Sequence, residues 1–213
     1  MNRNRILLFA LVALLCVGPG AFAMTVTWEG TDGGSQLISG STGGQLPAGC
    51  MLVLGNFGTM TDAQIAALGS NPSAMVWPAF QSWATTAIDS DGVFSESTIR
   101  GGSASFGGEQ AYLVAFNSPS FYTATVAGVF KGPSSNPSVG DPWVFPASDD
   151  APGVRFSLDA ITQNGVITGG WGTFNSPKFG GPVNALIVGV PEPSTYMLVG
   201  IGLLGVLTLR RRS

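Results

Sequence analysis

The sequence predicts a mainly β, antiparallel sandwich-like domain with one or two short helices, flanked by an N-terminal signal peptide and a single C-terminal transmembrane helix. Short apolar stretches recur between glycine, serine and proline clusters, a spacing typical of β-sandwiches and other antiparallel domains. The chain has 31 glycines and 14 prolines but only 10% charged residues. Because 45% of its residues are hydrophobic, it is too apolar for a solvated disordered chain, and a packed domain is expected.

The first 23 residues have the three parts of a secretory signal peptide. Arg3 and Arg5 precede an apolar run over residues 6–17, and the small-residue site Ala-Phe-Ala follows. Ala21 and Ala23 are the small residues expected at the signal peptidase site, with cleavage after Ala23. A run of 12 apolar residues is too short to span a bilayer, which disfavours an uncleaved N-terminal anchor.

Residues 24–189 are expected to form one exported, mostly β domain. Nine segments bounded by turn residues have the composition and apolar pattern of short strands. These segments are residues 25–28, 36–39, 50–54, 93–99, 111–116, 124–130, 154–158, 166–171 and 185–188.

One helix is predicted to begin after Thr61. Thr61 and Gln64 have the spacing of a capping box, in which each side chain bonds to the backbone of the other residue. Ile65 and Leu68 provide the apolar face, and Gly69 stands at the C-cap.

Two further segments have a less regular pattern. A second helical turn or two is expected after residues 71–72, with Phe80 directed inward, and Pro78 limits its length. Residues 132–152 contain five prolines and are expected to form a long irregular loop. Trp143 is expected to pin this loop to the core, together with Phe145.

The composition of residues 24–189 excludes several classes of function. The chain contains no histidine, which rules out Ser-His-Asp and Cys-His catalytic systems and histidine metal sites. Eleven acidic residues against four basic ones give this segment a net charge of −7, which disfavours nucleic acids and anionic lipids as partners. The four basic residues are Arg100, Lys131, Arg155 and Lys178. Cys50 is the single cysteine of residues 24–189, so no internal disulfide can form in this segment, and we expect its thiol to be buried.

The best candidate for a metal site is formed by Asp89, Asp91 and Glu96, which surround a glycine turn. Carboxylates at alternate positions in such a turn can converge on Ca²⁺. However, Ala87 and Thr98 stand where an EF-hand loop has its first and last ligands. We favour the simpler interpretation, an Asp-rich β-turn that leads into the following strand. No other cofactor is expected.

Carboxylates and tryptophans also suit a carbohydrate-directed function. A glycoside hydrolase needs only two carboxylates about 5 to 9.5 Å apart, but among eleven acids some pair will be this close by chance. Tryptophans stack on sugar rings, although in a small domain they more often supply core area. The five tryptophans are Trp28, Trp77, Trp83, Trp143 and Trp171. Exposed tryptophans beside carboxylates in a concave face would favour sugar binding.

Residues 190–213 contain three features in order. Pro191, Glu192 and Pro193 precede a mostly apolar segment at residues 196–209, and three arginines follow. Fourteen residues make roughly 21 Å of helix, short of a hydrocarbon core of about 30 Å, so the arginines must snorkel for the helix to span. These residues, Arg210, Arg211 and Arg212, hold the C-terminus in the cytoplasm as a stop-transfer signal.

This combination resembles the PEP-CTERM sorting signal of Gram-negative bacteria that make extracellular polysaccharide. The resemblance implies an inner-membrane intermediate whose tail is recognised and removed by exosortase, a multipass membrane enzyme. The product would be secreted to the cell surface or the extracellular matrix of a biofilm. Residues 54–57 and 62–68 also resemble a stretch found in other proteins with this tail; that resemblance names no activity.

We therefore predict an exported cell-surface or extracellular-matrix protein without catalytic activity. Its partners would be signal peptidase and exosortase during export, the inner membrane transiently, and exopolysaccharide as a ligand, with no nucleic acid. The alternative is an exopolysaccharide-binding or carboxylate-based glycan-cleaving domain.

Overall fold

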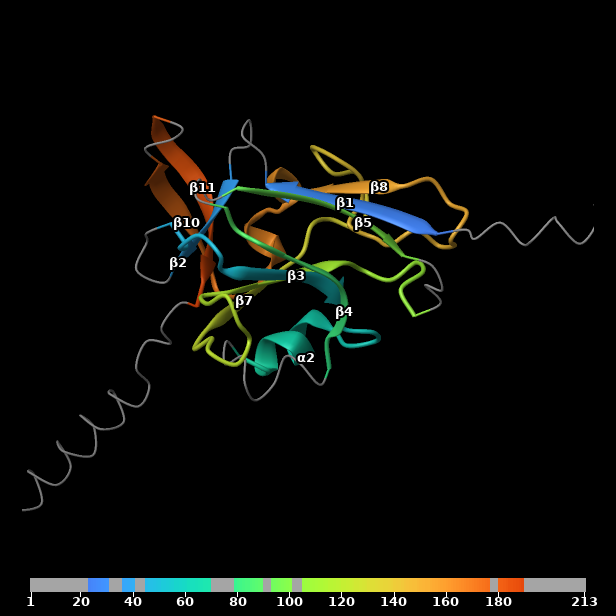
Figure 1. The fold of residues 1–213 in the computed structure, drawn as a ribbon, viewed down its shortest axis with the longest axis horizontal. Coiled ribbons are helices and arrows are strands. Elements are labelled where there is room, and N and C mark those ends of the chain that lie inside the picture. The colour runs from blue at the N-terminus through green and yellow to red at the C-terminus, as the bar shows by residue number, and fades with distance from the viewer. Residues whose placement is uncertain are drawn as a thin grey trace, which may run out of the picture.

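The computed structural model describes residues 23–30, 36–40, 45–69, 79–89, 93–100, 105–176 and 180–189, whose strands form three sheets (Figure 1). The first sheet has the order β5 (Phe94–Arg100), β1 (Met24–Gly30) and β8 (Val154–Ser157). The second has the order β10 (Gly170–Ser176), β11 (Gly181–Val188) and β2 (Gln36–Gly40). The third has the order β4 (Gln81–Ala87), β3 (Met51–Asn56), β6 (Tyr112–Phe116), β7 (Ala127–Phe130) and β9 (Val166–Thr168). The helices are α2 (Asp62–Ala67) and the 3-10 turns η2 (Leu158–Ala160) and η3 (Gln163–Gly165).

The described part of the chain is mainly β, and most of its strand pairs are antiparallel, as predicted. Two pairs are parallel: β1 with β8, and β11 with β2. Parallel neighbours cannot be joined by a hairpin and need a long connection. These pairs are not visible in the strand pattern, because each joins segments more than 100 residues apart.

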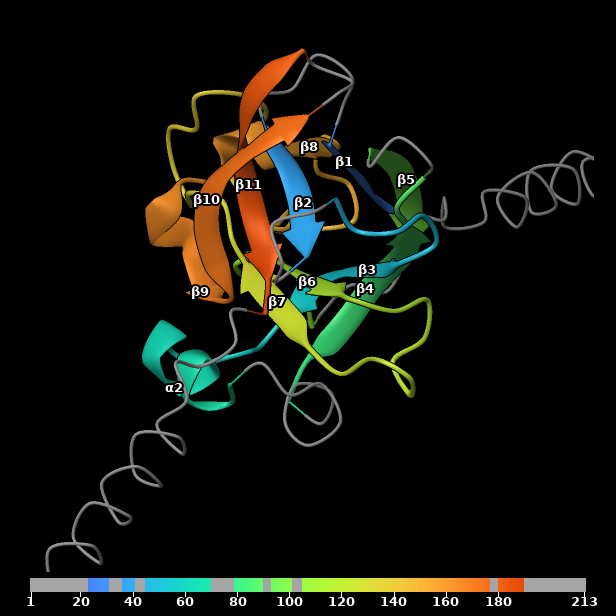
Figure 2. The same ribbon diagram turned by 90° about the vertical axis from the view of Figure 1, so that its left-hand side faces the viewer.

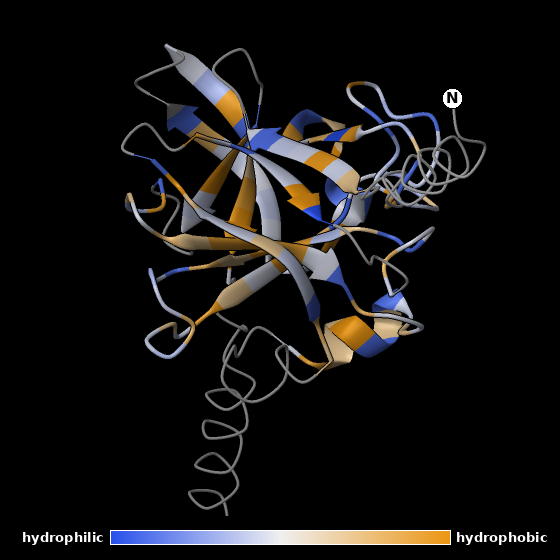
Figure 3. Cartoon of the chain, turned by 45° about the vertical axis from the view of Figure 1, so that its right-hand side comes forward, coloured by the Kyte–Doolittle hydropathy of each residue, from blue (hydrophilic) through white to orange (hydrophobic). Residues whose placement is uncertain are grey.

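The main core lies between the three sheets (Figure 2). Trp28 of β1, Phe156 of β8, Leu54 of β3, Phe130 of β7 and Leu186 of β11 all belong to this cluster and are buried. Hydrophobic residues concentrate on the strands, whereas many of the connecting segments are hydrophilic (Figure 3). Burial of side chains from all three sheets in one cluster holds the sheets together.

A second apolar cluster covers the outer face of the five-stranded sheet. Val53 of β3 and Val114 of β6 contribute to it from the sheet, and Ile65 contributes from α2. Their neighbours Leu54 and Leu113 belong to the main core on the opposite face. Both faces of β3 and β6 are therefore buried, which explains why these strands are continuous apolar runs and not alternating ones.

Three predicted strands need correction, and one strand was not predicted. The strand predicted at residues 185–188 begins earlier, at Gly181. The predicted strand at residues 166–171 is two strands, because Gly169 has a φ of +104° and sends β9 and β10 into different sheets. The strand predicted at residues 124–130 begins only at Ala127. The missed strand is β4, an edge strand in which Trp83 and Ala84 are the only buried residues. Its weak apolar pattern gave no strand signal.

The predicted helix is present as α2. The Thr61 hydroxyl accepts a hydrogen bond from the Gln64 amide, and the Gln64 side chain accepts one from the Thr61 amide, so the capping box is confirmed. Leu68 is the C-cap, and Gly69 follows it with a φ of +73°, a conformation that glycine adopts without strain. Residues 70–78, where a second helix was predicted, lie outside the described residues, but Phe80 is buried as expected.

Residues 132–152 form the predicted irregular loop, with one isolated bridge between Val144 and Gln110. Trp143 and Phe145 are both buried in the main core, which confirms that they pin the loop. The predicted transmembrane segment at residues 196–209 lies outside the described residues and stays a prediction. Among the helices that the structure describes, none is long and apolar enough to cross a membrane.

Candidate functional site

A polar pocket of about 410 Å³ lies where the start of α2, the end of β7 and the turn η3 come together. Its volume is within the range of small-molecule sites. The polar side chains that line it are those of Asp62, Gln110, Lys131, Ser134, Ser135, Thr162 and Asn164. Gly132, Pro133 and Gly165 complete the lining.

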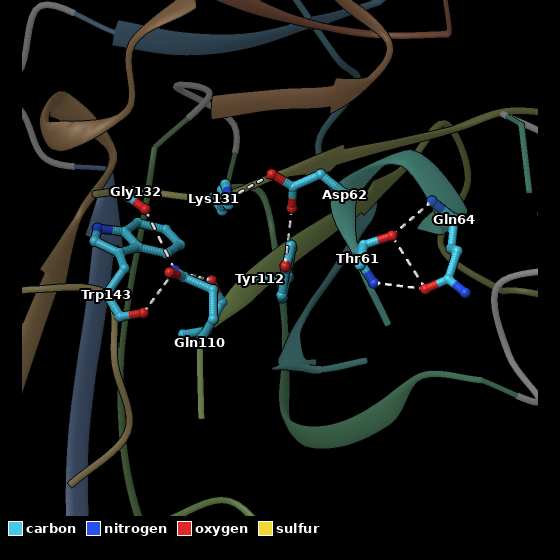
Figure 4. A network of polar contacts seen from close by, with 9 residues as sticks. Thr61, Asp62, Gln64, Gln110, Tyr112, Lys131, Gly132 and Trp143 are labelled. Carbon is cyan, nitrogen blue, oxygen red and sulfur yellow. Dashed lines mark hydrogen bonds and ion pairs between the residues drawn. The ribbon is translucent and has the colours of Figure 1, made fainter. Parts of the chain in front are cut away.

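An ion pair forms one wall of the pocket. Asp62 is the first residue of α2, directly after the capping residue Thr61, so the capping box fixes its position. Lys131 follows the last residue of β7. The Lys131 Nζ lies 2.6 Å from Asp62 Oδ2, and the two residues are drawn together in Figure 4. Both side chains are partly exposed, so solvent screens this pair.

Tyr112 also binds the Asp62 carboxylate. Its hydroxyl donates a hydrogen bond of 3.1 Å to Asp62 Oδ1 (Figure 4). Burial raises the pKa of Tyr112 above its ordinary value, and the negative charge of Asp62, the hydrogen bond to it and the charge of Glu109 raise the pKa further. Tyr112 therefore stays a neutral hydrogen-bond donor at physiological pH.

Gln110 fixes the loop that forms the opposite wall. Its Nε2 lies 2.7 Å from the Trp143 carbonyl oxygen, 3.0 Å from that of Ala111 and 3.3 Å from that of Gly132 (Figure 4). One amide group thus joins the start of the long loop to its middle. The side-chain NH2 group of Gln110 is thus used in contacts with backbone carbonyl oxygens, and these contacts shape the pocket.

The floor of the pocket requires a glycine. The Lys131 amide donates a 2.8 Å hydrogen bond to the Gly165 carbonyl oxygen. A Cβ at position 165 would lie 2.1 Å from the Lys131 carbonyl oxygen, closer than any real contact. Only glycine allows the two backbones to approach in this way.

This arrangement is suited to binding a small polar molecule. Lys131 is a donor, whereas Asp62 and the backbone carbonyl groups are acceptors. The side-chain amide of Asn164 and the hydroxyls of Ser134, Ser135 and Thr162 can donate and accept. Asp62 is the single acid among the lining residues that the structure describes. Across the described residues, no group of three or more cysteine, aspartate and glutamate side chains is arranged to hold a metal ion.

The predicted cation site is described only in part. Asp91 lies outside the described residues, so a site formed by Asp89, Asp91 and Glu96 stays a prediction. The Asp89 carboxylate accepts a 3.0 Å hydrogen bond from the Val93 amide, and Glu96 on β5 accepts one of 3.4 Å from Thr86. The Asp89 bond is the kind expected of the interpretation favoured above, an Asp-rich turn that leads into the strand.

The tryptophans give little support to sugar stacking. Trp28, Trp83 and Trp143 are buried in the main core, and Trp171 on β10 packs against it while partly exposed. Trp77 lies outside the described residues. Three of the five candidate stacking residues are therefore core residues, as expected of tryptophan in a small domain.

Comparison with known families bears on the C-terminal residues. Residues 189–212 match the family described as the PEP-CTERM protein-sorting motif. The chain carries a PEP-CTERM sorting signal. The match agrees with the predicted signal at residues 190–213 to within one residue at each end. Comparisons with curated proteins and with solved structures gave no match.

The PEP-CTERM signal supports an exported protein that exosortase processes on its way through the membrane to the cell surface. Its predicted functional residues, Pro191 to Pro193 and Arg210 to Arg212, lie outside the described residues, as does Ala21 of the predicted signal peptidase site. Ala23 is the first described residue and directly precedes β1. Gly189, the first residue of the PEP-CTERM match, directly follows β11.

The pocket was not predicted from the sequence. Asp62 and Lys131 are 69 residues apart, and no local motif joins them. One signal was available, because residues 24–189 contain only four basic residues. Lys131 pairs with Asp62, Arg155 pairs with Glu29, and Arg100 donates to backbone carbonyls and lies over the Trp83 ring. Because the segment has so few basic residues, each one is expected to pair with a particular acid or aromatic ring.

Proposed function

We propose that this protein is a non-catalytic component of the cell surface or extracellular matrix, delivered by a disposable PEP-CTERM tail. The observation that carries the proposal is the position of the signal in the fold. The last strand that the structure describes, β11, ends at Val188, and the PEP-CTERM match begins at Gly189. Removal of the tail would therefore take away none of the strands described above.

The contacts of β11 support a domain that stays folded after processing. β11 pairs with β10 from Gly181 to Ile187 and with β2 over five residues. Leu186 and Val188 are fully buried in the main core. These interactions involve residues upstream of the signal, so they do not depend on the tail.

The charged residues favour a structural role over catalysis. Arg155 pairs with the nearly buried Glu29, and Lys131 pairs with Asp62, which also accepts from Tyr112. Charges committed to each other in this way hold segments of the fold in place. The lack of histidine removes the commonest general base.

Mass spectrometry of the extracellular protein tests the proposal. The gene should be expressed in a host that contains an exosortase, beside a matched strain that lacks it. We expect extracellular material without Arg210 to Arg212 in the first strain, and accumulation of the uncut precursor in membranes in the second. Replacing Pro191, Glu192 and Pro193 by alanine should reproduce the second result. Extracellular protein with intact C-terminal arginines would overturn the sorting part of the proposal.

A second candidate function is the binding of a polyhydroxylated ligand, such as a saccharide, in the polar pocket. The specific observation is the mixture of hydroxyl, amide and charged side chains around about 410 Å³ of space. Sugar hydroxyls donate and accept hydrogen bonds at the same atom, and a mixed lining serves both roles. Binding is favoured over cleavage because the lining contains one acid, and glycoside hydrolysis uses a pair.

A glycan array followed by calorimetry tests this second candidate. Ser135→Ala and Asn164→Ala remove exposed polar groups of the pocket lining. We expect them to weaken binding of any glycan that is retained, whereas Asn184→Ala, on an exposed position of β11, should leave it unchanged. Equal binding by all three variants would exclude the pocket as the binding site.

A further inference from the structure

We propose that the loop at residues 117–126, here called the Tyr122 loop, contacts the lipid interface of the membrane while the precursor is still anchored. The inference rests on the proposed PEP-CTERM sorting, because the anchor is the tail that follows Gly189. It identifies a surface of the folded domain that faces the bilayer before processing.

Tyr122 is exposed to an unusual degree for an aromatic residue. Its relative exposure is 92%, compared with 69% for Ile99 and 42% for Val139, the other exposed large hydrophobic residues of the described chain. Its ring packs edge-on against Phe121 at 5.4 Å between centroids, and Phe121 in turn packs edge-on against the buried Phe116. The aromatic pair therefore leads from the apolar core to the surface.

Side-chain hydrogen bonds hold the base of the Tyr122 loop in one conformation. The Asn117 Oδ1 accepts from the amides of Thr125 and Val126, at 3.0 and 3.2 Å, and its Nδ2 donates to the Thr125 hydroxyl at 2.8 Å. The Ser118 carbonyl oxygen accepts from the Met51 amide of β3 at 2.9 Å. The base of the loop is thus closed and tied to the sheet.

Polar groups also fix the tip. The amides of Thr123 and Ala124 both donate to the Ser120 carbonyl oxygen, at 3.1 and 3.0 Å. The Ser120 hydroxyl accepts from the Tyr122 amide at 3.3 Å. Tyr122 is therefore presented by an ordered turn, which lowers the entropy that docking would cost.

Both ends of the Tyr122 loop lie close to Gly189, the residue that follows β11 and precedes the tail. Figure 2 shows the end of β11 meeting β7. Gly189 lies directly against Val126, because a Cβ at position 189 would be 2.6 Å from the Val126 Cβ. Asn117, at the other end of the loop, donates from its amide to the Val126 carbonyl oxygen. Gly189 also has a φ of +64°, so this close contact depends on glycine.

The chain length restricts how far this site can move from the bilayer. Gly189 and Tyr196, where the predicted membrane segment starts, are separated by only six residues. Even fully extended, seven Cα–Cα steps reach about 25 Å. Tyr122 is four residues from Val126 and lies at most about 14 Å from it along the chain. In the anchored precursor the Tyr122 loop therefore stays within about 40 Å of the start of the membrane segment, which leaves the lipid surface within its reach.

The chemistry of the loop suits a lipid interface. Tyrosine has an apolar ring and a polar hydroxyl, the combination enriched at membrane interfaces. Residues 117–126 contain no charged side chain, so the loop itself is not repelled by anionic headgroups although residues 24–189 carry a net charge of −7.

Photocrosslinking of the full chain in lipid vesicles tests the inference. The protein should be reconstituted in phosphatidylcholine vesicles that contain a lipid with a photoreactive group near the headgroup, and labelled peptides identified by mass spectrometry. We expect label on residues 117–126 and on the tail. Tyr122→Ser should lower the label on residues 117–126 several-fold, whereas Ile99→Ser, on the exposed face of β5, should not change it. Unchanged circular dichroism would show that both variants fold.

The other outcomes separate the inference from its premise. Label on residues 196–209 without label on residues 117–126 would overturn the inference and leave the sorting proposal standing. Label on neither segment would overturn the membrane-anchored precursor, and the inference with it. Label on residues 117–126 that requires exosortase in the vesicles would show that the loop contacts the enzyme and would overturn the lipid as its partner.

Discussion

The indole of Trp143 lies directly on the backbone of Gly132. A Cβ built on Gly132 would be 2.1 Å from Trp143 Cδ1, and the Trp143 amide donates to the neighbouring Pro133 carbonyl oxygen at 2.9 Å. This contact attaches the middle of the long loop at residues 132–152 to its first residue, two positions after the end of β7. It also sets the wall of the pocket, because Gly132 and Pro133 belong to the lining.

Gly132→Ala is expected to destabilise the domain by about 1–3 kcal/mol, the usual cost of forcing extra volume into a packed site. Denaturant unfolding followed by tryptophan fluorescence measures the change. Gly181→Ala is the matched control, because no atom lies within 4 Å of a Cβ at that position. Equal stability of the two variants would show that Trp143 moves aside at little cost.

The two ion pairs are expected to differ in their contribution to stability. The Glu29 side chain is only 10% exposed, whereas that of Asp62 is 46% exposed. Arg155→Met leaves a nearly buried carboxylate unpaired and should cost about 1–3 kcal/mol. Lys131→Met should cost less than about 1 kcal/mol, because solvent reaches Asp62 and Tyr112 still donates to it. Equal losses in urea unfolding would contradict this ranking.

Stability is expected to fall at alkaline pH because of Tyr112. The pKa of Tyr112 is raised in the folded state, chiefly by burial, so the unfolded chain loses this proton first. Above pH of about 10 the folded state holds more protons than the unfolded state, and the free energy of unfolding falls by about 1.4 kcal/mol per pH unit from this group. The measurement is urea unfolding between pH 8 and 11. Tyr112→Phe should remove this part of the slope, and an identical slope would refute the assignment.

Thr61→Ala is expected to cost about 1 kcal/mol, because it removes the acceptor for the Gln64 amide at the start of α2. It should also loosen Asp62, which the cap positions at the pocket. Thermal unfolding measures the loss, with Thr59→Ala at an exposed turn position as the control. A loss of stability in Thr61→Ala no larger than that in Thr59→Ala would contradict the prediction.

Cys50 is expected to be unreactive in the folded protein. It is buried, and burial raises the pKa of its thiol, so little thiolate is present at neutral pH. A colorimetric thiol reagent should label it only after denaturant is added. Rapid labelling of the native domain would show that the segment around Cys50 opens readily.

The sequence by itself determined the features that depend on neighbouring residues. The capping box of α2 needs only Thr61 and Gln64, three positions apart, and both bonds are formed. The apolar runs of β3 and β6 were recognisable because both faces of these strands are buried. The PEP-CTERM signal was recognisable because it is a contiguous stretch of sequence, in which the motif, the apolar segment and the arginines follow one another.

Only the tertiary structure decided which distant residues meet. Glu29 and Arg155 are 126 residues apart, and they lie together because β1 and β8 are parallel neighbours. Asp62 joins Tyr112 and Lys131, at separations of 50 and 69 residues, because α2 packs over the sheet that carries β6 and β7. A local pattern fixes the hydrogen bonds and apolar face of one element, whereas the pairing of elements is set by burial over the whole chain. For that reason the PEP-CTERM signal could be recognised in the sequence. The pocket, and the position of the Tyr122 loop beside Gly189, could not.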